Sequence, residues 1–281
     1  IRNLELYHSN QQNAVTLLDV IDKTISPMGG RMLKRWMALP LKNVETIKRR
    51  HEVVSYLIEE TQVLDKVKTN IKRIGDLERL ISKVATGKAS TREIVLLKDS
   101  LKAILPIKSS AESSKNNAVK SLGNQLHTCQ DLIDKISETL FDEAPVNINK
   151  GNAIANGVHQ ELDDLRAISN SGKEYLDNML ARETERTGIT SLKIAFNNVF
   201  GYYIEVRNTH KDKVPEEWIR KQTLVSAERY ITEELKEYET KILGAEEKIA
   251  KLEQEIFSKL LQYIIQYVQI VQENAQIIAK I

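Results

Sequence analysis

Cysteine, proline and glycine are all scarce in this chain, which has 1 Cys, 5 Pro and 11 Gly among 281 residues. The single cysteine, Cys129, excludes internal disulfides and cysteine-rich metal sites and indicates a reducing compartment, so we expect a cytoplasmic protein. Few prolines and glycines argue against a turn-rich β protein. Together with a charged fraction of 28%, they favour helical structure instead.

Long apolar runs are missing as well. No stretch approaches the roughly 18 residues that span a bilayer, and no signal peptide opens the chain, so we expect no membrane partner. The formal net charge of +2 is too small to steer a polyanion, so cationic residues must be clustered if one is bound. The chain starts at Ile1 and stops at Ile281 inside a helical pattern, and we therefore expect a piece of a longer protein.

Sequence motifs for catalysis or metal binding are not found. The five histidines fit no zinc spacing such as H-E-x-x-H. The run Met28–Arg31 lacks the G-x-x-x-x-G-K-[ST] pattern of a phosphate-binding loop. Adjacent carboxylates such as Asp163 and Asp164 point in different directions on a helix and cannot act as an acid and base pair. We predict that the chain holds no catalytic residue, no metal site and no cofactor.

Most of the first 158 residues show apolar side chains at every third or fourth position, which predicts a bundle of amphipathic helices. Helix starts are marked at Ser26–Pro27, at Asn43, and at Ser90 with Glu93 three residues later. These signals predict short connections between well-defined helices.

The pattern also predicts the extent of several elements. We expect one helix from about Val63 to Ala85, a helix that closes at Pro106, and a helix from Leu122 through Leu140. The segment Asp142–Gly157 predicts a loop or short hairpin. Asn3–Tyr7 alternates like a short strand.

Two longer helical patterns follow. The first runs from about His159 to Arg186 with an expected bend at Ser171–Gly172, and would be roughly 40 Å long. The second begins at Thr232 and keeps apolar steps of three and four from Ile242 to Ile281, about 70 Å if unbroken. We predict that the two helices pack antiparallel, whereas a continuous coiled coil that dimerises the protein is the alternative.

The segment between the two long helices alternates like β structure and is rich in aromatic residues. Residues 192–197 and 202–207 predict two strands, residues 198–201 the turn between them, and the region of Trp218 to Tyr230 a cover for the apolar strand. The predicted fold is mainly α, with a helical core at 1–158, long antiparallel helices at 159–188 and 232–281, and a small antiparallel β insertion at 189–231.

Cationic, amide and hydroxyl side chains remain outward on this insertion, and such groups contact phosphates without reading base sequence. The candidate DNA-binding residues are Lys193, Asn197, Arg207, Arg220, Lys221, Ser226 and Arg229. Acidic neighbours such as Glu205, Glu216 and Glu228 nearly balance this charge, so an ordinary solvated surface stays open as an alternative. Tyr202 and Tyr203 could stack on bases, but they fit the core of a small sheet better.

Several runs resemble the MutS family of DNA mismatch-repair proteins, in order and spacing over essentially the whole chain. They are Arg2–Leu6, Leu17–Thr24, Met28–Trp36, Ile74–Arg79, Arg186–Ile189, Gly201–Val206, Gln222–Leu224 and Ala227–Tyr230. The resemblance implies a helical core, two lever helices and a β clamp that grips the backbone of double-stranded DNA. It also implies a homodimer with a second subunit, and an ATPase that uses ATP and Mg in a part of the full-length protein that this chain lacks.

The resemblance places backbone-contacting groups at Lys193, Asn197, Lys221 and Ser226. Many relatives carry Lys-Asn where this chain has Val225-Ser226, so the contact there is expected to be weaker or differently made. We therefore expect a noncatalytic DNA-clamping and signal-coupling module. The alternative is a structural coiled-coil protein that dimerises through Ile242–Ile281 and binds no nucleic acid.

Overall fold

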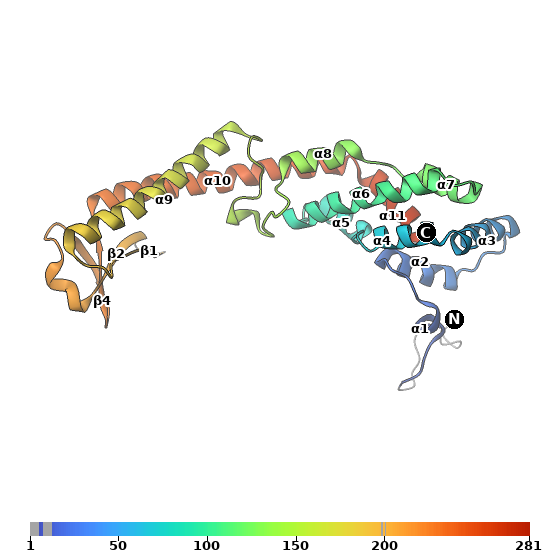
Figure 1. Cartoon of the computed structure of the whole chain (residues 1–281), viewed down its shortest axis with the longest axis horizontal. Helices are drawn as coiled ribbons and strands as arrows, with labels where there is room; N and C mark the ends of the chain where they lie inside the picture. Colours follow the sequence, from blue (N-terminus) through green and yellow to red (C-terminus); the bar gives the residue numbers. More distant parts are fainter. Residues whose placement is uncertain (1–5, 8–12, 198, 200) are drawn as a thin grey trace. The chain divides into compact units, whose positions relative to one another are not determined.

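The structure, a computed structural model, describes residues 6–7, 13–197, 199 and 201–281. These residues are mostly helical, with one small antiparallel sheet (Figure 1), which confirms the predicted fold class. The chain divides into two compact units. Residues 1–155 with 256–281 form what we call the helical unit, and residues 156–255 form the arm unit.

The helical unit is built from amphipathic helices around a buried core. Its elements are α1 (Leu17–Ile21), α2 (Pro27–Ala38), α3 (Val44–Glu59), α4 (Thr61–Ile71), α5 (Leu77–Ala85), α6 (Thr91–Glu112), α7 (Asn117–Gln125), α8 (Gln130–Thr139), η2 (Ile148–Lys150) and α11 (Val268–Lys280). Leu97, Leu101 and Ile104 of α6 are at most 1% exposed, so α6 lies at the centre of this core.

The predicted helix starts are confirmed. The Ser26 hydroxyl accepts a hydrogen bond from the Gly29 amide, the Asn43 side chain accepts one from Thr46, and Ser90 and Glu93 form a capping box. The predicted loop at residues 142–157 is confirmed too, with Leu140 and Ile154 joined by a single β-bridge. The predicted strand at Asn3–Tyr7 falls largely outside the described residues.

The prediction of one helix over 63–85 was wrong, because the chain breaks between α4 and α5. The Asp76 side chain accepts a hydrogen bond from the Arg79 amide and starts a new helix. Just before it, Gly75 lies against α6, where a Cβ atom would come within 3.2 Å of Leu96, and its amide donates to the Ser100 hydroxyl at 2.9 Å. The break thus serves a contact between helices that the apolar period does not encode.

Two further helix ends differ from the prediction. Pro106 does not close α6, which continues to Glu112 and buries Ile107 at 1% exposure, so packing outweighs the one hydrogen bond that proline cannot make. The helix predicted over 122–140 is interrupted between α7 and α8, where Cys129 has φ of 50°. The wholly buried Asn274 holds this connection, because its side chain donates to the carbonyl oxygen of His127 at 3.0 Å and accepts from the His127 amide at 2.8 Å.

The arm unit contains α9 (Gln160–Thr187) and most of α10 (Glu233–Ile265), whose last residues, from 256 on, belong to the helical unit. We call these two long helices the arms. Tyr175 stacks on Tyr238 with ring centroids 3.6 Å apart, and Arg182 contacts Glu234 at 2.7 Å, so residue numbers rise along α9 as they fall along α10. The arms are therefore antiparallel, as predicted. The predicted cap is confirmed as well, because the Thr232 hydroxyl accepts from the Leu235 amide at 3.1 Å.

The helix does not break at the predicted bend, Ser171–Gly172, and the return segment is not a single unbroken helix. The first arm is continuous through Gly172, where a Cβ atom would lie 2.6 Å from Ile242 of α10, so this glycine permits close approach of the arms. The second arm ends at Ile265, and α11 begins at Val268. The amide of Tyr267 bonds to the carbonyl of Ile264 at 2.9 Å, a tight turn that an apolar repeat does not reveal.

The segment that connects α9 to α10 in the sequence forms the head, a four-stranded antiparallel sheet in the order β1-β2-β4-β3. Its elements are β1 (Lys193–Asn197), β2 (Gly201–Arg207), η3 (Asn208–Lys213), β3 (Ile219–Thr223) and β4 (Ala227–Ile231). Trp218 and Tyr230 are buried with Ile204 in one cluster, which confirms the predicted cover. Tyr202 packs against this cluster, whereas Tyr203 is 6% exposed on the opposite face of the sheet under Arg229. Both rings are therefore packed within the protein, as predicted. Of the predicted turn, Asn198 and Phe200 lie outside the described residues.

Across the described part of the chain, no helix combines the length and the apolar character that crossing a bilayer requires.

Close helix packing predicts the effect of a small substitution at Gly123. A Cβ atom there would lie 2.7 Å from the Ala111 Cβ and 2.9 Å from a backbone nitrogen, so Gly123→Ala forces α6 and α7 apart. We expect a loss of about 1–3 kcal/mol in the free energy of unfolding, followed in urea by Trp36 fluorescence in a Trp218→Phe background.

Gly244→Ala is the matched control, because no atom lies within 4 Å of the added methyl group on α10. It should instead gain about 0.5–1 kcal/mol through helix propensity, read from Trp218 in a Trp36→Phe background. Equal effects of the two substitutions would contradict the packing explanation.

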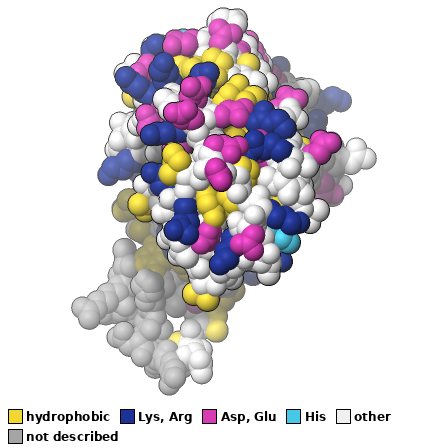
Figure 2. Space-filling view, turned by 90° about the vertical axis from the view of Figure 1, so that its left-hand side faces the viewer, with side chains coloured by type: hydrophobic (Ala, Val, Ile, Leu, Met, Phe, Trp, Pro, Cys, Tyr) yellow, Lys and Arg dark blue, Asp and Glu magenta, His cyan; other side chains and the backbone are white. Residues whose placement is uncertain are grey.

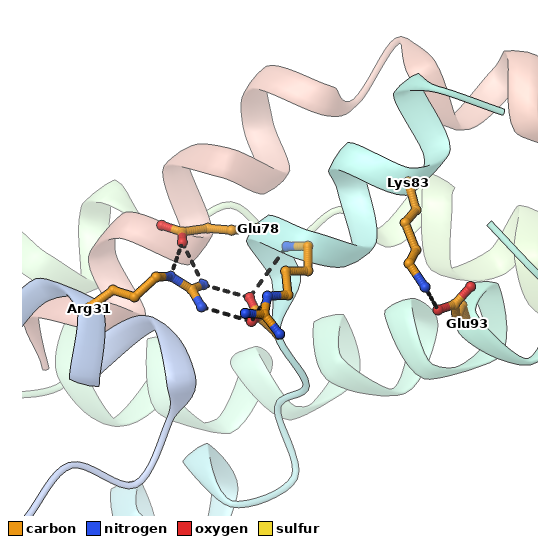
Figure 3. Close-up of polar contacts among 6 residues, drawn as sticks. Arg31, Glu78, Lys83 and Glu93 are labelled. Carbon is orange, nitrogen blue, oxygen red and sulfur yellow. Dashed lines mark hydrogen bonds and ion pairs between the residues drawn. The ribbon is translucent and has the colours of Figure 1, made fainter. Parts of the chain in front are cut away.

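Arg31 joins α2 to the start of α5 and predicts a pH effect (Figure 3). Its guanidinium contacts Asp76 at 2.7 Å and Glu78 at 2.6 Å. Hydrogen bonding from Arg31 lowers the pKa of Asp76 below its usual value. The stability that this carboxylate contributes is present above its unfolded-state pKa and is lost as the pH falls through its folded-state pKa.

Arg31→Met should therefore reduce the free energy of unfolding by about 1 kcal/mol near pH 7 and flatten its decline in acid. Urea titrations from pH 7 to 3 measure both effects. A variant whose stability falls with acid as steeply as that of the parent chain would contradict this role of Arg31.

Candidate nucleic-acid interface

The register of the head sorts its side chains onto two faces. Ile204 of β2 is opposite Tyr230 of β4, and both are buried in the cluster that includes Met179 of α9 and Leu235 of α10. Because side chains alternate along a strand, the neighbours of opposite parity lie on the other face of the sheet. That second face, which we call the outer face, carries Lys193, Ala195, Asn197, Tyr203, Glu205, Arg207, Gln222 and Arg229.

The same register brings several candidate residues together at one end of the sheet. Glu205 is opposite both Lys193 and Arg229, and Arg207 is opposite Ala227. Ser226 precedes Ala227, and its carbonyl accepts from the Asn208 amide at 3.1 Å. Lys221 is the middle residue of β3, at a register shift beside Arg229, which is opposite Glu205. We call Lys193, Arg207, Lys221 and Ser226 the cationic end of the head.

Asn197 does not join this group. It lies opposite Gly201 at the other end of the sheet, six residues along β2 from Arg207, a separation on the order of 20 Å. Its side chain accepts a hydrogen bond from the Val199 amide at 2.8 Å and so shapes the β1–β2 turn. The resemblance alone could not reveal this local role.

Two of the candidate arginines are engaged by carboxylates within the sheet. Arg229 contacts Glu205 at 3.2 Å, donates to Gln222 at 2.9 Å, and lies 4.3 Å above the centre of the Tyr203 ring. Its side chain is only 18% exposed, so Arg229 organises the outer face rather than offering a free cation.

Arg220 points to the other side of the sheet, where it contacts the buried Glu228 at 3.2 Å. The pKa of Glu228 is lowered, chiefly by the hydrogen bond from the Tyr230 hydroxyl and also by Arg220. Burial, and next the bond to Glu228, raises the pKa of Tyr230 to about 12. This network keeps Glu228 charged and Arg220 occupied.

The other candidates remain accessible. Lys193, Arg207, Lys221 and Ser226 are exposed, and within the described residues none of these three cations makes an ion pair. Lys211 and Lys213 of η3 are exposed too, and Lys211 is close enough to Glu228 to help lower the pKa of that carboxyl. Their position directly after β2 is the signal that would have added them to the candidate set.

Acidic groups mark the opposite end of the sheet. The Glu239 carboxylate of α10 accepts from the Tyr202 amide at 3.2 Å and fills the space where a side chain at Gly201 would lie. Burial raises the pKa of Tyr202, and the charges of Glu246 and Glu239 raise it further. The two ends of the sheet therefore carry different charged groups, and the face in Figure 2 shows Lys and Arg interspersed with Asp and Glu.

Nothing in the described residues resembles a metal centre, because no three His, Cys, Asp or Glu side chains converge there. Cys129 is buried, and burial raises the pKa of its thiol to about 11, so it is a poor nucleophile. The exposed cations and the Ser226 hydroxyl of the head can make electrostatic and hydrogen-bonding contacts with an anion.

A family model and several curated relatives match this chain, and all of them point to the same family. The family model described as MutS domain III matches residues 1–281. The DNA mismatch repair protein MutS of Flavobacterium johnsoniae is 67% identical over 281 residues, which is 100% of this chain and 32% of that relative. The MutS proteins of Parabacteroides distasonis and Porphyromonas gingivalis are 56% and 49% identical, again over 100% of this chain and 32% of theirs. The chain spans about a third of the length of these curated relatives, and it belongs to the MutS domain III family.

Proposed function

We propose that this chain is the DNA-clamping and signal-coupling module of a mismatch-repair protein, and that the cationic end of the head grips duplex DNA. The observation that carries the proposal is the exposure of Lys193, Arg207, Lys221 and Ser226 toward one end of the sheet. Cations release counterions from the phosphate backbone, and neutral donors fix the position of the strand without reading bases.

The geometry favours contact with the backbone over contact with base edges. Among the described residues of the outer face, the large aromatic group is Tyr203, which is covered by Arg229 and is 6% exposed. Stacking on bases requires accessible rings. The head therefore binds duplexes of different sequence about equally, and its affinity depends strongly on salt.

The arms supply the coupling. We infer that residues 1–158 act as the core, 159–188 and 232–281 as levers, and 189–231 as the clamp. Helices of 28 and 33 residues, α9 and α10, are stiff enough to carry a displacement of the head along their length. The part of the full-length protein outside this chain would contain an ATPase that uses ATP and Mg. A second subunit would complete a cytoplasmic homodimer around the DNA.

The rival function, a dimerising coiled coil through 242–281, finds less support. Ile242 is 1% exposed within the arm unit, where it contacts the head cluster. Asn274 and Ile278 are at most 1% exposed within the helical unit. These positions of the apolar repeat are occupied inside the chain, and the repeat is broken at Tyr267.

Removal of the three exposed cations tests the proposal directly. Lys193→Ala, Arg207→Ala and Lys221→Ala combined should weaken duplex binding at low salt. They should also reduce the slope of log K against log salt by roughly 0.9 for each phosphate that the head no longer neutralises. Fluorescence anisotropy with duplexes of two unrelated sequences measures affinity and sequence preference together.

Lys236→Ala, Lys248→Ala and Lys251→Ala combined form the matched control, because these exposed lysines of α10 carry the same charge outside the sheet. An equal loss of affinity in both triple variants would mean that overall charge alone matters. Binding that survives removal of the three head cations would contradict the proposal.

Two exposed valines test which end of the head meets DNA. Val225, in the β3–β4 turn beside Ser226, is 102% exposed, and Val199, in the β1–β2 turn, is 86% exposed. Val225→Lys adds a cation at the cationic end and should tighten duplex binding about three- to tenfold at low salt. Val199→Lys makes the same change at the acidic end and should have little effect. If Val199→Lys alone tightens duplex binding, DNA contacts the end of the sheet at the β1–β2 turn, which contradicts the proposal.

A further inference from the structure

A buried ion pair joins the arms. Arg166 of α9 and Glu253 of α10 lie 2.6 Å apart, with side chains that are 12% and 0% exposed. The Arg166 guanidinium also donates to the Asn156 side chain at 3.0 Å and lies 3.7 Å from Asp163. Both charges are therefore held in a nearly dry contact with several polar partners, which is unusual for a helix surface.

Such a pair adds little net stability, because removing two charges from water offsets most of their attraction. Its larger effect is to disfavour other alignments of the two helices. Any alignment that separates Arg166 from Glu253 leaves a charge buried without its counterion. A buried pair can thus select one alignment among several that apolar contacts would tolerate.

The remaining contacts between the arms leave that choice open. Ile242, Ala245 and Ile249 follow one another on α10 in steps of three and four, so Gly172 of α9 could face any of these small or branched side chains after a slip. A slip by one turn would displace one arm by about 5.4 Å. Such a slip would absorb the displacement that a lever has to transmit.

We propose that the Arg166–Glu253 ion pair fixes the register of α9 against α10 and so makes the two arms move as one lever. The two residues are positioning residues, because neither belongs to the cationic end of the head. The inference rests on the coupling part of the proposed function. The register of the two helices can be measured without DNA, however. A result that contradicts the register role can therefore be distinguished from a loss of DNA binding.

A second ion pair between the same helices provides the control. Arg182 and Glu234 lie 2.7 Å apart, but their side chains are 52% and 36% exposed. Water can solvate these charges if the pair separates, so this pair should contribute little to the choice of register. The two pairs have the same chemistry and differ in burial.

The experiment measures the distance between spin labels on the arms of the whole 281-residue chain. Exposed Glu161 of α9 and Lys241 of α10 are changed to Cys in a Cys129→Ala background. Pulsed electron paramagnetic resonance should give one narrow distribution of the distance between the two labels in this parent. Arg166→Met with Glu253→Met, which keeps the volume and removes the charges, should broaden it or add a population shifted by about 5 Å.

Arg182→Met with Glu234→Met should leave the distribution narrow. A narrow, unshifted distribution in the Arg166 and Glu253 double variant, with helical content unchanged by circular dichroism, would overturn the proposal. If that variant loses helix, Glu253→Gln decides, because it keeps the side-chain shape and removes one charge. Broadening in Glu253→Gln supports the register role, and an unchanged distance overturns it. Anisotropy with a DNA duplex on the same samples shows separately whether the head still binds.

Discussion

Burial of one face of the head against the ends of the arms is the constraint on which the rest of the structure depends. Ile204 and Tyr230 pack with Met179, Leu235 and Trp218 in a single apolar cluster. Since successive side chains of a strand point to opposite faces, this burial forces the residues of opposite parity outward. A shift of one residue in register would bury Lys193 and Arg207 and expose the cluster, so hydrophobic packing determines where the charges lie.

Ion pairing then divides the charges by role. Arg229 and Arg220 are engaged by Glu205 and Glu228, and they stiffen the two faces of the sheet. Lys193 and Arg207, which share the outer face with Arg229, remain exposed to solvent. The ion pairs between the arms differ in the same way. The Arg166–Glu253 pair is buried, whereas the Arg182–Glu234 pair is accessible to water. In both places burial decides whether a charge shapes the protein or is available to a partner.

The sequence predicted the architecture better than the boundaries of its elements. Local signals gave the helix starts at Ser26, Asn43 and Ser90, because capping depends on residues three positions apart. The interruption before Cys129 was missed because Asn274, which is 147 residues from His127 in the sequence, stabilises it. The continuation of α6 past Pro106 has the same kind of cause, a tertiary contact that outweighs a local preference.

The candidate site was predictable in composition and less so in geometry. Alternation placed Lys193 outward correctly, and the resemblance drew attention to Lys221 and Ser226. Alternation alone could not show that Asn197 lies at the far end of the sheet or that Arg229 is engaged by Glu205. These facts depend on strand order and register, which place β4 between β2 and β3.

Amide hydrogen exchange with and without duplex DNA at low salt tests the central claim most directly, because it reports contact without any substitution. DNA should slow exchange in residues 224–226 at the cationic end and in residues 208–213 of η3 next to Arg207, and should leave the amide of Val199 in the opposite turn unchanged. Protection confined to the β1–β2 turn or to the helical unit, or no protection anywhere in the head while DNA is bound, would contradict it.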